Sequence, residues 1–402
     1  MINQEVKDQA IALCQKLVQQ QSYSGHEDGV AKVLEETYKA NGFDSVHIDK
    51  YGNIIGCIKG KRPGKKILFD GHMDTVPVTN EKEWIHPPFA AEIHDGKIYG
   101  RGTTDMKGAI AAYTTAAIAF AKDTNKDFAG EIYVDGVVHE ECFEGVGSRS
   151  ISAYVKPDIV VIGEASQCNL KVGQRGRAEI VVERPYIQDL AEQTGETVHL
   201  VQMEGINAVY KMARVIEAIR TIVPPEHPVL GKGILELVDV KSAPYPGASV
   251  VPEYCRATYD RRLLVGETKE SVLAPIVALM DKLMADDPEL KVKVSYAVGK
   301  EKCYTGETIE GERFFPGWLF DKDAEFVQAV KKELNERGYD PEITQYNFCT
   351  NGSHYAGEAG IQTFGLGPSR ENLAHTVSEY VEVDSLAKVT DCYYGVLKAL
   401  MK

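Results

Sequence analysis

His72 and Asp74 have the residue types and the spacing of a metal-binding site. They close the run KKILFDGHMDT, which spans residues 65–75, and they lie two positions apart. Side chains at positions i and i+2 of a strand point to the same face, so His72 can offer a ring nitrogen to a metal while Asp74 orients the imidazole from behind. We therefore interpret His72 as a ligand and Asp74 as its support.

Further residues of ligand type follow other apolar stretches. They are Asp105 in YGRGTTDMKGA, Glu140 and Glu141 after the run 132–138, Glu164 after the run 159–162, and His375 in ENLAHTVSEY. Ligand sites in open α/β sheets form outside the carboxyl ends of the strands, so the repetition favours one shared site. Two histidines with three or four carboxylates are a donor set suited to zinc.

Several of these residues also have an ordinary structural explanation. Asp105 could cap a helix that the pattern predicts over 107–122, and Glu164 could be a capping or surface acid. His375 could be a structural histidine, and His139 is a competing ligand candidate beside the glutamate pair. The other histidines, at positions 26, 47, 86, 94, 227 and 354, we interpret as surface or packing residues.

The adjacent pair Glu140 and Glu141 suggests a division of labour. Neighbouring side chains of an extended segment point in opposite directions, so one glutamate can bind metal while the other faces the substrate. Metal-assisted hydrolysis needs a carboxylate off the metal that takes the proton from water and passes it to the leaving amine. The alternative is a solvated acidic turn.

Composition narrows the class of protein. The chain has 402 residues, 44% hydrophobic and 26% charged, which predicts an ordinary globular protein of two domains. The net charge of −14 disfavours nucleic acid and anionic membrane surfaces as partners. We expect a cytoplasmic protein because no signal-peptide pattern or stretch of about 20 apolar residues is present. Its 8 scattered cysteines fit reduced thiols.

Alternating elements predict an α/β fold. Helices are expected over 4–20 and 30–40, followed by strands over 45–48, 53–59 and 65–69. From about residue 173 a different unit follows, with helices over 205–222 and 269–285 and strands over 234–240 and 256–262. This β-α-β-β-α-β order predicts a small sandwich of one sheet and two helices. We expect a discontinuous catalytic domain, 1–176 and 294–402, with an inserted domain over 177–293.

Ordered motifs carry a family resemblance. HMDTVP, GRGTTDMKG, HEE, GEAS, GQRGR, GINAVYKMA, DRRL and AHTVSEYV resemble the zinc-dependent aminoacylase, acetylornithine deacetylase and succinyl-diaminopimelate desuccinylase family of clan MH metallopeptidases. GQRGR, LGKG, YDRRLLVGET and TNG resemble most a subgroup of hydrolases linked to selenium metabolism. The resemblance implies a zinc-peptidase-type catalytic domain with a mixed central sheet flanked by helices. The inserted α+β sandwich would be a lid or dimerisation domain, so a homodimer is implied.

The resemblance also implies a site with two divalent metal ions, zinc first and cobalt or manganese as alternatives. One metal would be held by His72, Asp105 and Glu164, the other by Asp105, Glu141 and His375, with Glu140 as general acid and base and Asp74 as the partner of His72. The expected reaction is hydrolysis of an amide bond in a small N-acyl amino acid. A dipeptidase or carboxypeptidase of the same family is the alternative.

Substrate contacts follow from the same resemblance. The family brings a histidine of the small domain to the developing oxyanion, and His199 is the nearest match, although its flanks in GETVHLVQMEGINA depart from the family pattern. A histidine in an exposed connection is the alternative. Arg261 or Arg262, of which we choose Arg262, and the turn residues Asn351, Gly352 and Ser353 resemble contacts to a substrate carboxylate. For the arginines, the alternative is a solvated charge pair.

Two other functional classes fit the sequence less well than this hydrolase. A non-catalytic relative that only binds a ligand would be expected to lose ligand residues, yet the full set is present. Structural calcium fits poorly because hard cations do not prefer imidazole ligands.

Overall fold

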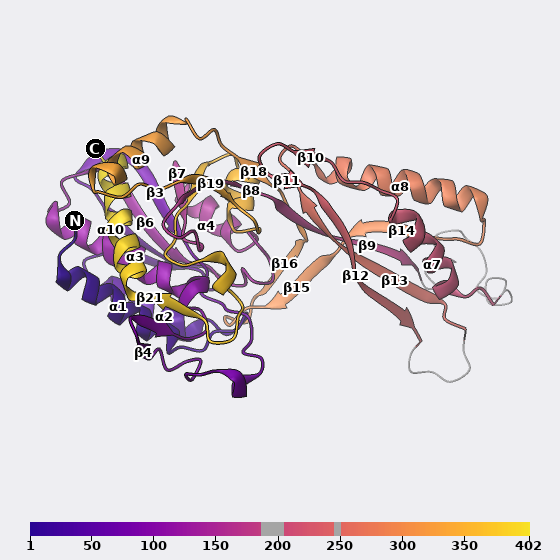
Figure 1. The fold of residues 1–402 in the computed structure, drawn as a ribbon, viewed down its shortest axis with the longest axis horizontal. Helices are drawn as coiled ribbons and strands as arrows, with labels where there is room; N and C mark the ends of the chain where they lie inside the picture. The colour runs from indigo at the N-terminus through magenta and orange to yellow at the C-terminus, as the bar shows by residue number, and fades with distance from the viewer. Residues whose placement is uncertain (186–204, 245–250) are drawn as a thin grey trace. The chain divides into compact units, whose positions relative to one another are not determined.

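A computed structural model describes residues 1–185, 205–244 and 251–402, and they divide into two compact units (Figure 1). Unit 1 contains Met1–Gln174, Gly299–Gly311 and Trp318–Lys402. Unit 2 contains Arg175–Val298 and Glu312–Gly317. Residues 294–298 and 312–317 were expected in the catalytic domain, but they belong to unit 2, where the strands Lys293–Tyr296 and Phe314–Phe315 pair with its sheet.

Unit 1 is built on a nine-stranded mixed sheet. Its strands, in spatial order, are β1 Ser45–Ile48, β2 Ile54–Lys59, β6 Ala129–Gly136, β3 Arg62–Asp70, β7 Ile159–Ile162, β20 Gln362–Gly365, β8 Leu170–Gln174 and β18 Trp318–Leu319, while β19 Ile343–Tyr346 pairs with β8. Strands β6, β3, β7 and β20 run parallel to their neighbours in this central part of the sheet. The α/β class with a mixed central sheet is therefore confirmed.

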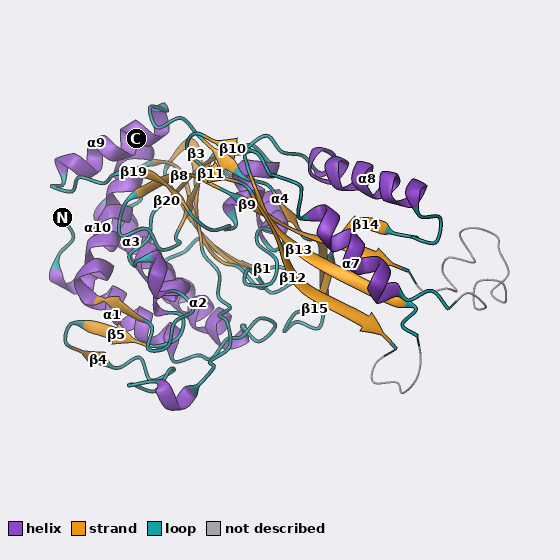
Figure 2. Ribbon diagram, turned by 45° about the vertical axis from the view of Figure 1, so that its right-hand side comes forward, coloured by secondary structure: helices purple, strands orange, loops and turns teal. Residues whose placement is uncertain are grey.

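Helices and short elements complete unit 1 (Figure 2). The helices are α1 Gln4–Val18, α2 Asp28–Ala40, α3 Gly108–Asp123, α4 Ser148–Val155, α9 Glu325–Glu336 and α10 Val383–Leu400, with single turns at Glu81–Glu83, Thr103–Lys107, Ser353–Glu358 and Glu371–Leu373. A small sheet is formed by β4 Ile93–His94, β5 Lys97–Tyr99 and β21 Tyr380–Glu382, and β15 Val298–Lys302 pairs with β16 Thr308–Glu312. Helix α1 begins where the Asn3 side chain accepts the Val6 N–H over 3.0 Å.

Both faces of the second half of strand β3, from Ile67 to Asp70, are buried, which explains the apolar run there. Phe69 packs against Tyr113 of α3 and Tyr393 of α10, with ring centroids 5.8 and 5.4 Å away. Leu68 points to the opposite face, where it shares a cluster with Ile151 of α4. Because alternate side chains meet helices on the two faces, the strand ends at a fixed position in the interior.

Unit 2 is a five-stranded antiparallel sheet covered by two helices. Its strands are β12 Ile234–Ala243, β13 Tyr254–Leu263, β9 Gly176–Arg184 and β14 Lys293–Tyr296 in that order, with β17 Phe314–Phe315 also on β9; β10 Glu226–His227 and β11 Gly231–Lys232 form a separate pair. Helices α7 Ala208–Ile219 and α8 Lys269–Asp286 bury Met212 and Ile276 against Ile180 and Tyr259 of the sheet. This core is the expected sandwich.

No helix among the described residues is long and apolar enough to cross a bilayer.

Candidate metal centre

The carboxyl ends of three adjacent parallel strands meet at one edge of the sheet of unit 1. Strand β3 leads to His72, β6 leads to Glu140 and Glu141, and β7 leads to Glu164. A bridge between His72 and Val137 continues the pairing of β3 with β6 beyond the ends of both strands. The predicted gathering of these side chains at strand ends is what the structure contains.

Two clusters of ligand-type atoms share Asp105. In the first, Nε2 of His72 lies 2.8 Å from Oδ1 of Asp105 and 3.4 Å from Oε1 of Glu164. In the second, Nε2 of His375 lies 3.0 Å from Oδ2 of Asp105 and 3.1 Å from Oε2 of Glu141. Each oxygen of Asp105 therefore faces a different cluster, which is the arrangement that a bridging carboxylate needs.

Asp105 is not a helix cap. Helix α3 begins at Gly108 with Lys107 as its N-cap residue, and Asp105 has a non-helical backbone with φ −126° and ψ 87°. Its carboxylate contacts His72 and His375 instead. The capping explanation was therefore wrong, because the chain turns once more between Asp105 and the helix.

The support of His72 differs from the expectation. Nδ1 of His72 lies 2.9 Å from the backbone carbonyl oxygen of Asp74, whereas the Asp74 carboxylate is 3.5 Å away. A donated Nδ1–H leaves the lone pair of the ring on Nε2, which faces Asp105 and Glu164. The carbonyl of Asp74, and not chiefly its carboxylate, orients the imidazole.

The carboxylate of Asp74 holds the glutamate pair. Its Oδ1 accepts the backbone N–H of Glu140 over 3.0 Å, and its Oδ2 accepts the N–H of Glu141 over 3.2 Å. The hydroxyl of Ser24 donates to Oδ2 over 2.6 Å. These bonds fix the backbone from which both glutamate side chains project.

Glu140 lies beside the first cluster without joining it. Its Oε2 is 4.0 Å from Nε2 of His72. Glu140 is 6% exposed, and its buried Oε1 has no hydrogen-bond partner among the described residues. Burial, followed by the charges of Glu164 and Glu141, raises the pKa of Glu140 well above its usual value, although His72 opposes the shift. An orphaned carboxyl oxygen in a buried site fits a group that exchanges a proton with a ligand.

Charge pairing and burial shift the pKa values of the remaining groups. Hydrogen bonds to Asp105 and Glu141 raise the pKa of His375 to about 10, and burial raises the pKa of Glu141 to about 7. Burial works against ionisation of Asp105, yet its bonds to His375 and His72 keep the pKa of Asp105 below its usual value. Each cluster thus contains two carboxylates and one imidazole, whose oxygen and nitrogen atoms lie at the spacing of metal ligands. This donor set fits zinc.

Sequence reasoning missed Glu379, which is 0% exposed. Its Oε1 accepts the backbone N–H groups of Gly102, Thr104 and Asp105 over 3.1, 2.8 and 3.1 Å, and its Oε2 pairs with Arg101 at 2.5 Å. Two residues of the quoted motifs could have pointed to this contact. Arg101 lies in the motif that carries Asp105, and Glu379 lies in the motif that carries His375. Glu379 ties these two segments together.

Other predicted residues lie outside both clusters. His139 places Nε2 3.1 Å from the carbonyl oxygen of Lys302, so it does not compete as a ligand. His199 falls outside the described residues. Arg262, in unit 2, pairs through Nε with Asp260 at 2.9 Å.

The turn expected to bind a carboxylate makes internal hydrogen bonds. The Asn351 side chain donates to Asp70 over 3.0 Å and accepts from the Gly145 N–H over 2.9 Å. The N–H groups of Gly352 and Ser353 both donate to Thr350, over 3.0 Å in each case. Substrate contact by these residues and by Arg262 stays a prediction.

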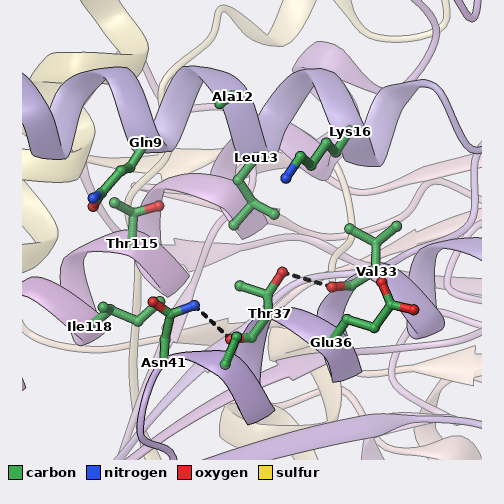
Figure 3. Close-up of a pocket in the computed structure, with 11 residues that line it drawn as sticks. Gln9, Ala12, Leu13, Lys16, Val33, Glu36, Thr37, Asn41, Thr115 and Ile118 are labelled. Carbon is green, nitrogen blue, oxygen red and sulfur yellow. Dashed lines mark hydrogen bonds between the residues drawn. The ribbon is translucent and has the colours of Figure 1, made fainter.

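A hollow of about 530 Å³ between α1, α2 and α3 is a separate feature (Figure 3). It is lined by Gln9, Ala12, Leu13, Lys16, Val33, Glu36, Thr37, Ala40, Asn41, Thr115 and Ile118. This lining has neither histidine nor cysteine, and Glu36 is its one carboxylate. It is therefore not a rival metal centre.

The chain is similar to known proteins over most of its length. The sequence model of "Peptidase family M20/M25/M40" matches residues 68–399. The uncharacterised protein YgeY of Escherichia coli K12 is 31% identical over 364 residues, which cover 89% of this chain and 86% of that protein. A succinyl-diaminopimelate desuccinylase of Hydrogenovibrio crunogenus is 27% identical over 419 residues, covering 98% and 99%. The solved structure of the Bacillus subtilis YxeP protein, described as a dinuclear metal-binding peptidase of the M20 family, has a TM-score of 0.66 at 14% identity and covers 100% of both chains.

Proposed function

The chain belongs to Peptidase family M20/M25/M40 and is therefore a metal-dependent amide hydrolase, and we propose that its substrate is a small N-acyl amino acid or a related compound. The sharing of Asp105 between two ligand clusters carries this proposal. The resemblance to a desuccinylase supports removal of an acyl group, which yields a carboxylate and an amine.

We assign the two clusters to two divalent metal ions, with zinc as the first candidate and cobalt or manganese as substitutes. His72, Asp105 and Glu164 would hold one ion, and Asp105, Glu141 and His375 the other. When bound, such ions supply a Lewis acid for the scissile carbonyl and lower the pKa of water. A dinuclear site in the YxeP protein supports the pair.

Glu140 is the proposed general acid and base. Its carboxyl lies next to the clusters, is buried, and has an oxygen that finds no partner in the part of the chain that the structure describes. It takes the proton from the attacking water and delivers it to the leaving nitrogen. The raised pKa suits a group that must hold this proton between the two steps. Asp74 positions Glu140 through the backbone bond described above.

Unit 2 is proposed as the lid and dimerisation domain, and His199 as the residue that stabilises the oxyanion. Strand β12 supports the homodimer: it lies at the end of the sheet order and has a partner strand on one side only among the described residues. Its side chains Ile234, Val238 and Val240 are 40%, 58% and 47% exposed. An exposed strand edge of this kind is a template for pairing with a second copy.

The cellular compartment and the subgroup are two further parts of the proposal. All eight cysteines are free thiols, which agrees with a reducing compartment such as the cytoplasm. Placement in the selenium-linked subgroup stays a prediction from the motifs.

Glu140→Gln tests the mechanism. We expect turnover to fall by at least about 100-fold, because general acid and base catalysis contributes on the order of 10²–10⁴. Two metal ions per chain should remain bound, as measured by elemental analysis, and chelation should abolish the activity of the wild type. Glu36→Gln, on α2 and outside both clusters, is the control. Wild-type turnover in Glu140→Gln would disprove the assignment.

Substrate profiling separates the deacylase from its alternatives. The metal-loaded enzyme is incubated with a pool of N-acyl amino acids, dipeptides and ureido compounds, and released amines are identified by mass spectrometry. Release from dipeptides alone would favour a dipeptidase or carboxypeptidase, in line with the peptidase relative. Bound metals without any hydrolysis would favour a non-catalytic relative.

A further inference from the structure

A second group of histidine and carboxylate side chains lies around the small sheet of unit 1. His86 precedes β4, Glu92 stands directly before it, and His94 ends it, as the chain order shows. Strand β5 pairs with β4 through His94 and Lys97, and the two strands lie side by side (Figure 2). Side chains two positions apart on an extended chain share one face, so Glu92 and His94 project together. None of the three belongs to the two clusters around Asp105.

The three side chains converge on a single oxygen atom. Oε2 of Glu92 lies 3.2 Å from Nδ1 of His86 and 3.0 Å from Nε2 of His94. Zinc bonds of about 2.0–2.2 Å at tetrahedral angles separate two ligand atoms by roughly 3.3 Å. The same kind of spacing, 2.8 to 3.4 Å, occurs between the ligand atoms of the clusters around Asp105.

Packing holds the rings in this arrangement. The ring of His86 stacks on that of His94 with centroids 4.0 Å apart, and it lies 4.4 Å from the ring of Tyr99 on β5. The carbonyl of Glu92 accepts the backbone N–H of Tyr99 over 2.9 Å. Gln15 of α1 donates to the carbonyl of Ala91 over 2.8 Å. A ligand would therefore find the three groups already placed.

Exposure and charge also suit a cation. The side chains of His86, Glu92 and His94 are 19%, 42% and 48% exposed, so water can complete the coordination of an ion. The net charge of −14 draws cations to the protein in general.

We propose that His86, Glu92 and His94 form an additional site for a divalent metal ion of the zinc class. Two imidazoles and one carboxylate are ligands for Zn²⁺, and imidazole also suits Cu²⁺ and Ni²⁺, whereas Ca²⁺ and Mg²⁺ prefer oxygen alone. The proposal differs from the interpretation of His86 and His94 as ordinary surface or packing residues. It is independent of the proposed function because it shares no ligand with the metal centre.

The competing explanation is a pair of plain hydrogen bonds. In that case both rings donate an N–H to Oε2 of Glu92, and the group needs no ion. The two explanations differ in what removal of the rings does. Loss of a metal site lowers the number of ions bound per chain, whereas loss of two surface hydrogen bonds leaves that number unchanged.

Zinc stoichiometry is the first test. The full-length protein is equilibrated with Zn²⁺ by dialysis, and zinc per chain is measured by elemental analysis. We expect His86→Ala/His94→Ala to bind one ion fewer than the wild type, and Glu92→Gln to bind that ion at least about tenfold more weakly. His47→Ala, a half-buried histidine on β1, is the control and should match the wild type. His375→Ala should lose an ion of the metal centre and keep this one.

The fluorescence of Trp84 can report whether an ion binds near His86. It lies two residues before His86, and the sequence contains 2 tryptophans. Cu²⁺ added to the zinc-loaded protein should quench the fluorescence of Trp84, and the quenching should disappear both in Trp84→Phe and in His86→Ala/His94→Ala. Equal zinc content and equal quenching in the wild type and the double variant would overturn the proposal. A loss of zinc in His47→Ala as large as in the double variant would also overturn it.

Discussion

Oε1 of Glu379 accepts the backbone N–H of Asp105 over 3.1 Å. The same oxygen accepts the N–H of Thr104 over 2.8 Å, and Arg101 neutralises the carboxylate from the other side. Because Glu379 stands four residues after His375, one buried carboxylate joins the segment that bears the shared aspartate to the segment that bears the second histidine. The distance between Asp105 and His375 thus depends on a residue that touches neither side chain.

Glu379→Gln should weaken metal binding. The amide keeps one acceptor oxygen but loses the charge that pairs with Arg101, so the Asp105 segment becomes less fixed. We expect metal affinity to fall by about 10–100-fold, as for other residues that orient ligands, and turnover at limiting metal to fall with it. Competition with a fluorescent chelator measures the affinity.

Glu382→Gln is the matched control for this variant. Glu382 lies in β21, is 40% exposed and contacts Arg370 at 3.5 Å, so its metal affinity should equal that of the wild type. If Glu379→Gln were less stable yet bound metal like the wild type, Glu379 would have a purely structural role.

Asp74→Asn should lower turnover while both metal ions stay bound. Its carboxylate accepts the N–H groups of Glu140 and Glu141, and an amide nitrogen at either oxygen would face a donor. The ring of His72 remains held by the backbone carbonyl of residue 74. We expect kcat to fall by about 10–100-fold, measured alongside metal content.

Ser24→Ala is the control for Asp74→Asn, because it removes a single hydrogen bond to the same carboxylate. It should lose far less activity. Loss of metal from Asp74→Asn would show that the carboxylate, and not the carbonyl, orients His72.

Metal affinity should rise with pH. His375, with a pKa of about 10, holds a proton at neutral pH that must leave when the ring binds an ion. Burial opposes protonation of His72, yet hydrogen bonds to Asp105, Asp74 and Glu164 raise the pKa of His72 well above its usual value, so this ring also releases a proton when it binds an ion. Apparent affinity should therefore increase by at least about tenfold per pH unit between pH 7 and 9, and more steeply below pH 7, where Glu141 also holds a proton. Chelator competition at pH 6, 7, 8 and 9 measures this dependence.

His354→Ala is the control for the pH series because His354 lies outside both clusters, and it should show the wild-type slope. Calorimetry in buffers of different ionisation enthalpy should report proton release at pH 8. An affinity that does not change across this range would contradict the protonated state of His375.

Glu27→Gln should change how stability depends on pH. Burial, and then the charge of Asp74, raises the pKa of Glu27 to about 8, whereas an unfolded chain releases this proton near pH 4.5. Between these values the folded state binds the extra proton, so the wild type loses stability as pH rises, by up to about 1.4 kcal/mol per pH unit. The neutral glutamine removes this contribution.

Denaturant unfolding at pH 5, 6.5 and 8, at constant metal loading, measures the effect. Glu27→Gln should gain stability relative to the wild type from pH 5 to pH 8, because its oxygen can still accept the N–H groups of Gly25 and His139. Glu35→Gln, at a surface ion pair with Lys39, should keep the wild-type slope. Parallel pH profiles for Glu27→Gln and the wild type would contradict the raised pKa.

Local sequence was sufficient to predict the main elements and which strand ends carry side chains of ligand type. The apolar runs before His72, Glu140 and Glu164 became adjacent parallel strands, since a run buried on both faces has few other arrangements in an α/β fold. The order of elements in unit 2 was predicted for the same reason, because helical and strand periodicities are properties of short segments. These features depend on residues close together in the chain.

Tertiary structure alone decided which atom each side chain reaches. Asp74 was expected to support His72 with its carboxylate. In the turn after β3, the carbonyl of Asp74 contacts the ring of His72, whereas its carboxylate accepts the backbone N–H of Glu140. Glu379 was missed because its partners lie in a segment that no local pattern connects to it, 274 positions away in the case of Asp105. Hydrogen bonds and ion pairs act over about 3 Å, so their partners are set by how distant segments pack.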